Sequence, residues 1–281
     1  MDSATARNGD VEIAYEVFGT SEGSPLLLVS GMDGQMIGWP DGFCLALAAA
    51  GYQVVRYDHR DAGLSTHFTG RKRAYEVTDM LDDMLAVQDS MGWTSAHLVG
   101  LSMGGGLAQF AALLRPERVK TLTLIGAAPQ YGNQLRLFRH IRFPGPFKMA
   151  FHRYGKSRDE QKRMLMDITR FSGGKSLPLE EDWIEEIAEE CLRRRRPDPH
   201  SRARQLAASR AAKMPKGGIG QITQPVLAIH GDEDPIVRPS AGRAIARTVQ
   251  DGTFVLVHRM GHLFSPPLWP ELVDRITRHA R

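Results

Sequence analysis

Short apolar runs alternate with helical patterns along much of the chain, and this alternation limits the possible folds more than any other feature. Leu26-Leu27-Leu28-Val29 is a continuous apolar run that stops at Ser30-Gly31, which is typical of a strand buried on both faces of a sheet. Similar runs recur at residues 53–57, 96–100, 121–125, 226–230 and 253–257. Helical patterns lie at 43–50 and 75–91. The chain therefore predicts an α/β fold with a mostly parallel central sheet flanked by helices.

The beginning of the chain has a different pattern. Asn8-Gly9 is a two-residue hairpin signal, and apolar residues then alternate with polar or small ones from Val11 to Val17. A strand with one solvated face has this pattern. We therefore expect antiparallel strands at the start of the sheet.

The alternation stops between Pro129 and Pro225. This segment has no convincing strand, but it carries helical patterns at 159–169 and 183–196. The strands on its two sides belong to one sheet, so we interpret it as an insertion. The prediction is a core domain of residues 1–129 and 222–281 and a helical lid of residues 130–221. Five large apolar residues of this lid are candidates for lining a ligand cavity, although core packing is the commoner use of such a stripe: Met149, Phe151, Met164, Leu165 and Met166.

Positive charge is concentrated in the same segment. Residues 131–221 carry a net charge of +9, whereas the rest of the chain carries −5. The run from Arg193 to Arg196 is a possible anion or nucleic-acid site. No aromatic residue interrupts it and the acidic stretch 180–190 precedes it, so we interpret it as a solvated helix face and expect no nucleic-acid partner.

Membrane, export and metal signals are weak. The long uncharged stretch from Ser90 to Leu114 contains polar residues and five glycines, so it indicates a strand, a turn and a helix instead of a membrane span. The N-terminal residues lack the apolar core of a signal peptide, which predicts a cytoplasmic protein without a membrane partner. Cys44 and Cys191 lack the spacing of a zinc site, and we expect neither a metal nor a disulfide framework.

The first candidate catalytic motif is Gly100-Leu101-Ser102-Met103-Gly104, which fits the pattern G-x-S-x-G. A predicted strand precedes it and a predicted helix follows, and this is the context of a nucleophile elbow. Glycine at 100 and 104 leaves room for the neighbouring strand and helix. A strand-to-helix turn with glycine packing would produce the same five residues, so the motif needs partners elsewhere in the chain.

An acid and a base follow in the order that such an elbow requires. The strand at 226–230 leads to Asp232 and Asp234, and the next strand leads to Met260-Gly261-His262. Both loops lie at the carboxyl edge of the sheet, where active sites of open α/β sheets form. Among ten histidines, His262 alone combines a loop after a strand with a preceding glycine. Pro235 stiffens the chain after Asp234, so we favour Asp234 as the acid and expect Asp232 to bond local backbone amides.

With these motifs in place, the chain resembles the α/β-hydrolases, and more narrowly the aclacinomycin methylesterases of anthracycline biosynthesis. The residues that carry the resemblance are Leu26 to Val29, Gly38-Trp39-Pro40-Asp41, Arg56 to Asp61 with Gly63 and Ser65-Thr66, Gly100 to Gly104, Asp234-Pro235-Ile236 and Met260-Gly261-His262. The resemblance implies an α/β-hydrolase fold with a catalytic triad of Ser102, Asp234 and His262. It covers nearly the whole chain except the lid.

The resemblance also implies an oxyanion hole made by the backbone amides of Met103 and of position 32. The family has glycine there and this chain has Met32, which keeps the amide but adds a flexible side chain at the mouth of the pocket. A second departure is Ser30-Gly31, where many α/β-hydrolases carry His-Gly. We interpret Asp58, Arg60 and Ser65 as loop scaffolding.

These features predict a serine esterase that forms an acyl-enzyme and needs no cofactor. The resemblance points to a methyl ester of an aromatic, polyketide-like small molecule. Cleavage of a carbon–carbon bond, a lactone or a thioester by the same triad is an alternative, as is a homologue that binds a ligand without turnover. The sequence leaves open whether the protein is a monomer or a homodimer.

Overall fold

The computed structural model describes residues 3–70, 74–130, 139–142, 154–198 and 200–281. Within these residues, eight strands pair into one sheet. The strands are β1 (Ala4–Asn8), β2 (Val11–Phe18), β3 (Ser24–Val29), β4 (Tyr52–Tyr57), β5 (Ala96–Leu101), β6 (Val119–Ile125), β7 (Val226–Gly231) and β8 (Gly252–Val257). Their order across the sheet is β1-β2-β4-β3-β5-β6-β7-β8. All pairs from β4 to β8 are parallel, and this confirms the predicted α/β fold.

The antiparallel start is confirmed as well. Asn8 pairs with Val11, so Gly9 and Asp10 form a two-residue turn in which Gly9 has a φ of +58°. Hairpin turns of this length need positive φ, which glycine adopts without a steric penalty. β2 then pairs antiparallel with β4.

Helices cover both faces of the sheet and enclose two apolar cores. The helices are α1 (Asp41–Ala49), α2 (Val77–Ser90), α3 (Met103–Leu114), α6 (Arg158–Ser172), α7 (Glu181–Arg194), α8 (Ser201–Ala211), α9 (Ser240–Thr248) and α10 (Trp269–His279), with short 3-10 turns η1 (Met36–Gly38), η2 (Pro116–Arg118), η3 (Gly218–Gln221) and η4 (Pro266–Leu268). Residues of α2, α3 and α9 pack in one core, whereas those of α1 and α10 pack in the other. Of the described helices, none is both long and apolar enough to cross a bilayer.

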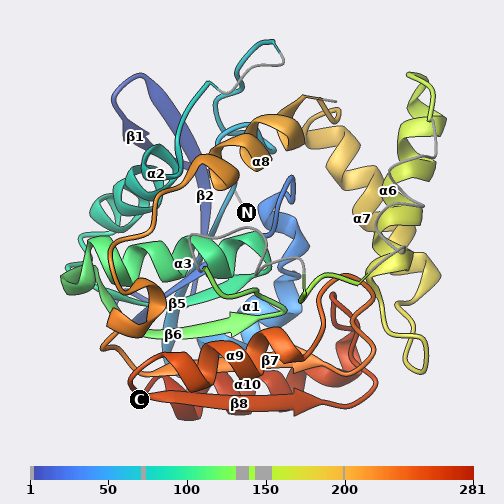
Figure 1. Ribbon diagram of the computed structural model, residues 1–281. Coiled ribbons are helices and arrows are strands. Elements are labelled where there is room, and N and C mark those ends of the chain that lie inside the picture. The colour runs from blue at the N-terminus through green and yellow to red at the C-terminus, as the bar shows by residue number, and fades with distance from the viewer. Residues whose placement is uncertain (1–2, 71–73, 131–138, 143–153, 199) are drawn as a thin grey trace.

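Between β6 and β7 the described residues form helices α6, α7 and α8 and no strand. The helical patterns at 159–169 and 183–196 correspond to α6 and α7, and α8 is a further helix that the sequence patterns did not indicate. In Figure 1 these three helices follow one another around one end of the sheet. The division into a core domain and a lid remains a prediction.

Two arginines of this segment are buried against acids of the core. Arg194, at the end of α7, has a side chain that is 5% exposed and contacts Asp58 at 2.5 Å. Arg204 of α8 is completely buried, and its Nε and Nη2 donate to the carboxylate of Asp61 at 2.7 and 2.8 Å. The interpretation of residues 193–196 as a solvated face is therefore wrong for Arg194, because Asp58 and Glu16 neutralise its charge below the surface.

The loop after β4 carries the acids that pair with these arginines, and hydrogen bonds anchor this loop to neighbouring segments. Asp58 accepts hydrogen bonds from the amides of Met36 and Leu64, at 2.7 and 2.9 Å. The Ser65 hydroxyl donates to the Asp58 carbonyl and accepts from the amide of Ala14. Arg60 pairs with Asp83 of α2 at 2.5 Å. The predicted scaffolding role of Asp58, Arg60 and Ser65 agrees with these contacts.

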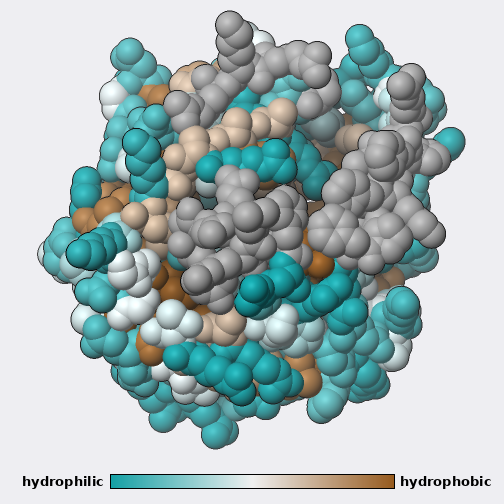
Figure 2. Space-filling model, in the orientation of Figure 1, coloured by the Kyte–Doolittle hydropathy of each residue, from teal (hydrophilic) through white to brown (hydrophobic). Residues whose placement is uncertain are grey.

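The described surface is mostly polar. Figure 2 shows hydrophilic residues along much of the described face in this view. Leu45 and Leu64 are the large apolar side chains that stand exposed in the described ranges, and neither belongs to α6, α7 or α8. The described parts of these helices therefore offer no exposed large apolar side chain as a starting point for a dimer interface.

Replacing the buried Arg204 should weaken the fold strongly. Arg204→Met leaves the carboxylate of Asp61 buried without its cation, and removing one partner of such a pair costs about 3–5 kcal/mol. Arg193→Met is the control, because Arg193 is 72% exposed and pairs with Glu190 on the surface, which is worth about 0–1 kcal/mol. Urea unfolding of both variants measures the difference. Equal free energies of unfolding would contradict the buried pair.

Candidate active site

Ser102 stands at the turn between β5 and α3 with an unusual backbone conformation. Its φ is 54° and its ψ is −116°, which for a residue with a side chain is a strained combination. A Cβ at Gly100 would lie 2.6 Å from the Gly104 carbonyl oxygen, and one at Gly104 would lie 2.2 Å from the Val29 carbonyl oxygen. The turn therefore requires both glycines, for the steric reason that the sequence indicated.

Asp234 and His262 are in direct contact. The Oδ2 atom of Asp234 lies 2.7 Å from Nδ1 of His262, and both side chains are buried. The other carboxylate oxygen of Asp234 accepts hydrogen bonds from the amides of Ile236 and Val237, each at 2.8 Å. These bonds fix the carboxylate, so it can hold one orientation and one tautomer of the imidazole.

Competing effects set the charge of Asp234. Burial by itself would raise the pKa of the carboxyl group, but the charge and hydrogen bond of His262 and the nearby His230 outweigh it and hold the pKa well below its ordinary value. Nε2 of His230 lies 3.5 Å from Asp234 Oδ2. Asp234 is therefore ionised throughout the neutral range and accepts the hydrogen bond of the imidazole as a carboxylate.

Asp232 has different partners, although it is only two residues from Asp234. Its Oδ1 accepts from the amide of Arg259 at 2.8 Å, and its Oδ2 lies 2.9 Å from Nδ1 of His258. The expectation that Asp232 bonds local backbone amides is wrong, because its partners lie at the end of β8 and it joins the ends of β7 and β8. Asp234 instead reaches the histidine that the sequence singled out. The structure brings together the acid and the base that were favoured as partners.

Ser102 and His262 line one pocket. The amide of Ser102 donates to the carbonyl of Ile125, and a Cβ at the next residue, Gly126, would lie 3.1 Å from Nδ1 of His262. The described residues show no hydrogen bond between the Ser102 hydroxyl and the imidazole. Catalytic hydrogen bonds are often long in free enzymes and tighten with substrate, so this geometry suits a serine and its base.

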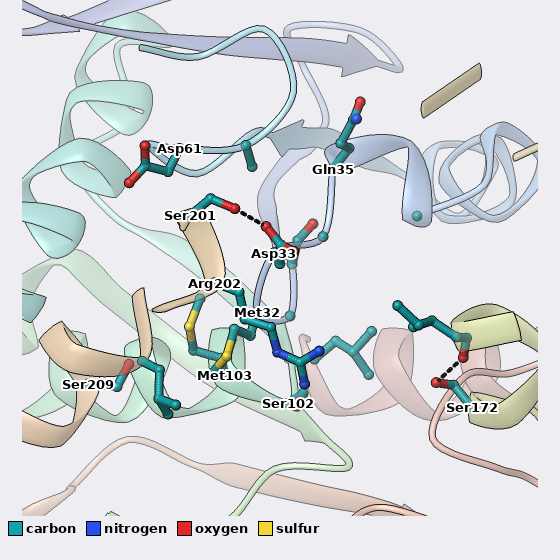
Figure 3. A pocket seen from close by; sticks show the side chains of 18 of the residues that line it. Met32, Asp33, Gln35, Asp61, Ser102, Met103, Ser172, Ser201, Arg202 and Ser209 are labelled. Atoms are coloured by element: carbon teal, nitrogen blue, oxygen red, sulfur yellow. Dashed lines mark hydrogen bonds between the residues drawn. The ribbon is translucent and has the colours of Figure 1, made fainter. Parts of the chain in front are cut away.

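Two backbone amides near Ser102 are free of described acceptors. Met103 is the first residue of α3, where an amide has no partner within the helix. Met32 follows Gly31, whose Cβ would lie 3.5 Å from the Cβ of Ser102. Both methionines line the pocket, and their side chains appear beside Ser102 in Figure 3. The predicted oxyanion amides are therefore close to the serine.

The C-terminal end of α6 holds the loop that carries His262. The carbonyl of Ser172 accepts hydrogen bonds from the amides of His262 and Leu263, both at 2.8 Å. Gly261 packs so closely that a Cβ would lie 2.3 Å from the carbonyl carbon of Gly173. No sequence pattern indicated this support, because Ser172 and Gly173 are polar or small residues in a segment without a motif.

The pocket that contains these residues has a volume of about 670 Å³. Large apolar side chains line it from several helices: Met80, Phe110, Met164, Leu165, Ile168 and Trp183. Of the predicted cavity residues, Met164 and Leu165 are lining residues and Met166 is not, while Met149 and Phe151 lie outside the described residues. A mostly apolar cavity of this size fits a small organic molecule.

One acid of the pocket has a perturbed pKa. Asp33 lines the cavity, and desolvation by the surrounding residues raises its pKa to about 6, against a hydrogen bond from Ser201 and the charge of Arg202, which lower it. Figure 3 shows the Ser201 hydroxyl directed at this carboxylate. The sequence did not single out Asp33. Elsewhere in the described chain, no group of three or more histidine, cysteine or carboxylate side chains is placed to hold a metal ion.

The sheet is mostly parallel, with a strained serine after one central strand and an acid and a histidine after later strands. This arrangement defines a class of hydrolases with a serine nucleophile. The family described as "alpha/beta hydrolase fold" matches residues 24–266. The chain belongs to the α/β-hydrolase fold family.

The relatives include two methylesterases that match the whole chain. The rhodomycin D methylesterase DauP of Streptomyces sp. (strain C5) is 29% identical, over 100% of this chain and 99% of its own. The rhodomycin D methylesterase DnrP of Streptomyces peucetius is 28% identical with the same coverage. The resemblance to this group of methylesterases is confirmed.

Solved structures share the fold. A hydrolase from Pseudomonas aeruginosa PA01 has a TM-score of 0.72 at 22% identity, covering 99% of this chain and 96% of its own. MGS-M2, an α/β hydrolase from a deep-sea metagenome library, has a TM-score of 0.76 at 18% identity, covering 98% and 96%. At these identities the likeness concerns the fold alone.

Neutralising Asp33 should stabilise the protein, and more so at higher pH. The folded-state pKa of about 6 exceeds the ordinary 3.8, so the folded form retains a proton that the unfolded form releases between these values. Stability from this group therefore falls as pH rises through that window. Asp33→Asn should raise the melting temperature more at pH 7.5 than at pH 4. Asp182→Asn, which removes an exposed charge from α7, is the control. If the gain in melting temperature of Asp33→Asn were the same at both pH values, the expectation would be contradicted.

Proposed function

We propose that the protein is a carboxylic ester hydrolase that uses Ser102 as nucleophile, His262 as base and Asp234 as the acid that orients it. The observation that carries this proposal is the Asp234–His262 contact of 2.7 Å in a pocket that also contains the strained Ser102. Full-length relatives that are named methylesterases support an ester as the substrate. This geometry favours acyl transfer to a serine.

The reaction follows from the positions of these groups. His262 takes the proton of the Ser102 hydroxyl as the oxygen attacks the ester carbonyl, and the tetrahedral oxyanion accepts hydrogen bonds from the amides of Met32 and Met103. His262 then protonates the departing alcohol, leaving an acyl-enzyme on Ser102. Water, deprotonated by His262, hydrolyses this ester. Asp234 stabilises the imidazolium in both steps.

We propose that residues 130–221 act as a lid over this site and form its substrate cavity. α6, α7 and α8 contribute lining residues, including Met164, Trp183 and Leu206. The volume and apolar lining of the pocket suit a fused aromatic skeleton, and the relatives' names point to a methyl ester of an aromatic, polyketide-like molecule. A cytoplasmic location and the absence of a nucleic-acid partner remain predictions from the sequence.

Removing the nucleophile tests the proposal directly. Ser102→Ala should reduce the turnover of p-nitrophenyl esters about 10⁶-fold while leaving the melting temperature within a few degrees of the parent, because the hydroxyl has no described structural partner. Relative rates of the parent with methyl, short-acyl and bulky aromatic esters report the size and shape of the pocket. A fluorophosphonate should label the parent stoichiometrically and leave the variant unlabelled. Undiminished hydrolysis by the variant would refute the assignment.

The two neighbouring aspartates provide a matched comparison. Asp234→Asn should lower kcat about 10⁴-fold, because an amide favours the wrong imidazole tautomer. Asp232→Asn keeps the oxygen that accepts from the Arg259 amide and lies outside the proposed relay, so we expect kcat to stay within about threefold. Steady-state rates with p-nitrophenyl butyrate compare the variants. If kcat fell more in Asp232→Asn than in Asp234→Asn, Asp232 and not Asp234 would be the acid that orients His262.

A further inference from the structure

Arg202 places a positive charge on the wall of the pocket that contains Ser102. It is the second residue of α8, and it lines the same pocket as Ser102 and His262. Figure 3 shows its guanidinium pointing from α8 toward Ser102, past the side chain of Met32. The mechanism proposed above gives this cation no role.

The acids around Arg202 are engaged by other groups. Arg204, two residues further along α8, pairs with both Asp61 and Asp198. Asp33 accepts a hydrogen bond from Ser201. In the described part of the chain no ion pair joins Arg202 to a carboxylate, and Arg202 remains exposed enough to meet a ligand.

Asp33 is the carboxylate whose pKa responds to Arg202, so it is the nearest candidate for a counter-charge. Desolvation raises the pKa of Asp33 to about 6, so at neutral pH this carboxylate is mostly ionised and offsets one positive charge beside the pocket. Two further arginines, Arg195 and Arg196, line the pocket from the connection between α7 and α8. The described α7–α8 wall therefore presents an excess of positive charge to a cavity that is otherwise mostly apolar.

We propose that Arg202 is a specificity-determining residue that binds a carboxylate on the acyl portion of the substrate, so that the enzyme selects esters of acids carrying a second, ionised carboxyl group. This inference rests on the proposed ester hydrolase function. A guanidinium binds a carboxylate through two parallel hydrogen bonds and remains charged at all working pH values. Where the leaving alcohol is as small as methanol, the anion can lie only on the acyl side.

The position of Arg202 also determines where the second carboxyl group would lie in the cavity. In Figure 3 its guanidinium extends into the pocket on the side of Ser102. With the anion at Arg202 and the scissile carbonyl at Ser102, the apolar remainder of the acyl group would lie against side chains of α3 and α6, such as Phe110 and Ile168.

Two esters that differ only in this charge test the proposal. Mono-p-nitrophenyl adipate carries a carboxylate where p-nitrophenyl hexanoate carries a methyl group. Arg202→Ala should lower kcat/KM for the adipate roughly 10- to 100-fold, the range expected for hydrogen bonds to a charged group, and change the hexanoate value less than about threefold. Arg193→Ala, which removes an exposed arginine of α7 outside the pocket, should change neither value.

A binding measurement separates this inference from the proposed function. In the Ser102→Ala background the adipate ester is not cleaved, and calorimetry should show binding that is tighter than for the hexanoate and is lost when Arg202→Ala is added. Equal losses for both esters, or no loss for the adipate, would overturn the role of Arg202 while Ser102-dependent hydrolysis stands. If the parent cleaves neither ester, the proposed function fails, and the calorimetric preference alone still decides whether Arg202 binds the anion.

Discussion

The backbone of Ser102 is the constraint on which the rest of the site depends. A serine with positive φ costs of order 1–3 kcal/mol and persists only where the surroundings enforce it. Here the enforcement comes from the sheet, since the Ser102 amide donates to the carbonyl of Ile125 in the neighbouring strand, and from Gly100 and Gly104, which permit close contact with α3 and β3. The strained turn projects the hydroxyl into the pocket, and the strand order then places β7 and β8, with their acid and histidine, on the same side.

The helical segment between β6 and β7 contributes both lining residues and supporting contacts to the site. Its Ser172 carbonyl holds the amides of His262 and Leu263, so α6 contributes to the position of the imidazole. At the other end of the segment, Arg194 and Arg204 pair with Asp58 and Asp61 in the loop after β4. These buried pairs orient α7 and α8 against the core, because a displaced arginine would leave an uncompensated carboxylate behind. The pocket wall and the proposed catalytic loops are therefore coupled through the same contacts.

The net charge of the segment did not indicate how its arginines are used. Several pair on the surface, as Arg170 does with Glu181, and others pair below it, as Arg194 and Arg204 do. Arg202 and Arg204 belong to one helix turn, yet they differ completely in environment. A helix rotates by about 100° per residue, so side chains two positions apart point in nearly opposite directions. One of the two therefore faces the buried acids and the other faces the cavity.

The sequence by itself determined the parallel sheet, the antiparallel start and the turn at Ser102, because these features follow from local apolar periodicity and from the steric demands of single glycines. It also ranked Asp234 above Asp232, since Pro235 constrains the chain next to it, and the contact with His262 agrees. The carbonyl of Ser172 behind His262, the burial of Arg194 and Arg204, the desolvation of Asp33 and the direction of Arg202 were decided by the tertiary structure alone. Each of these depends on which residues, distant along the chain, the packing of α6, α7 and α8 brings together, and no local pattern encodes that packing.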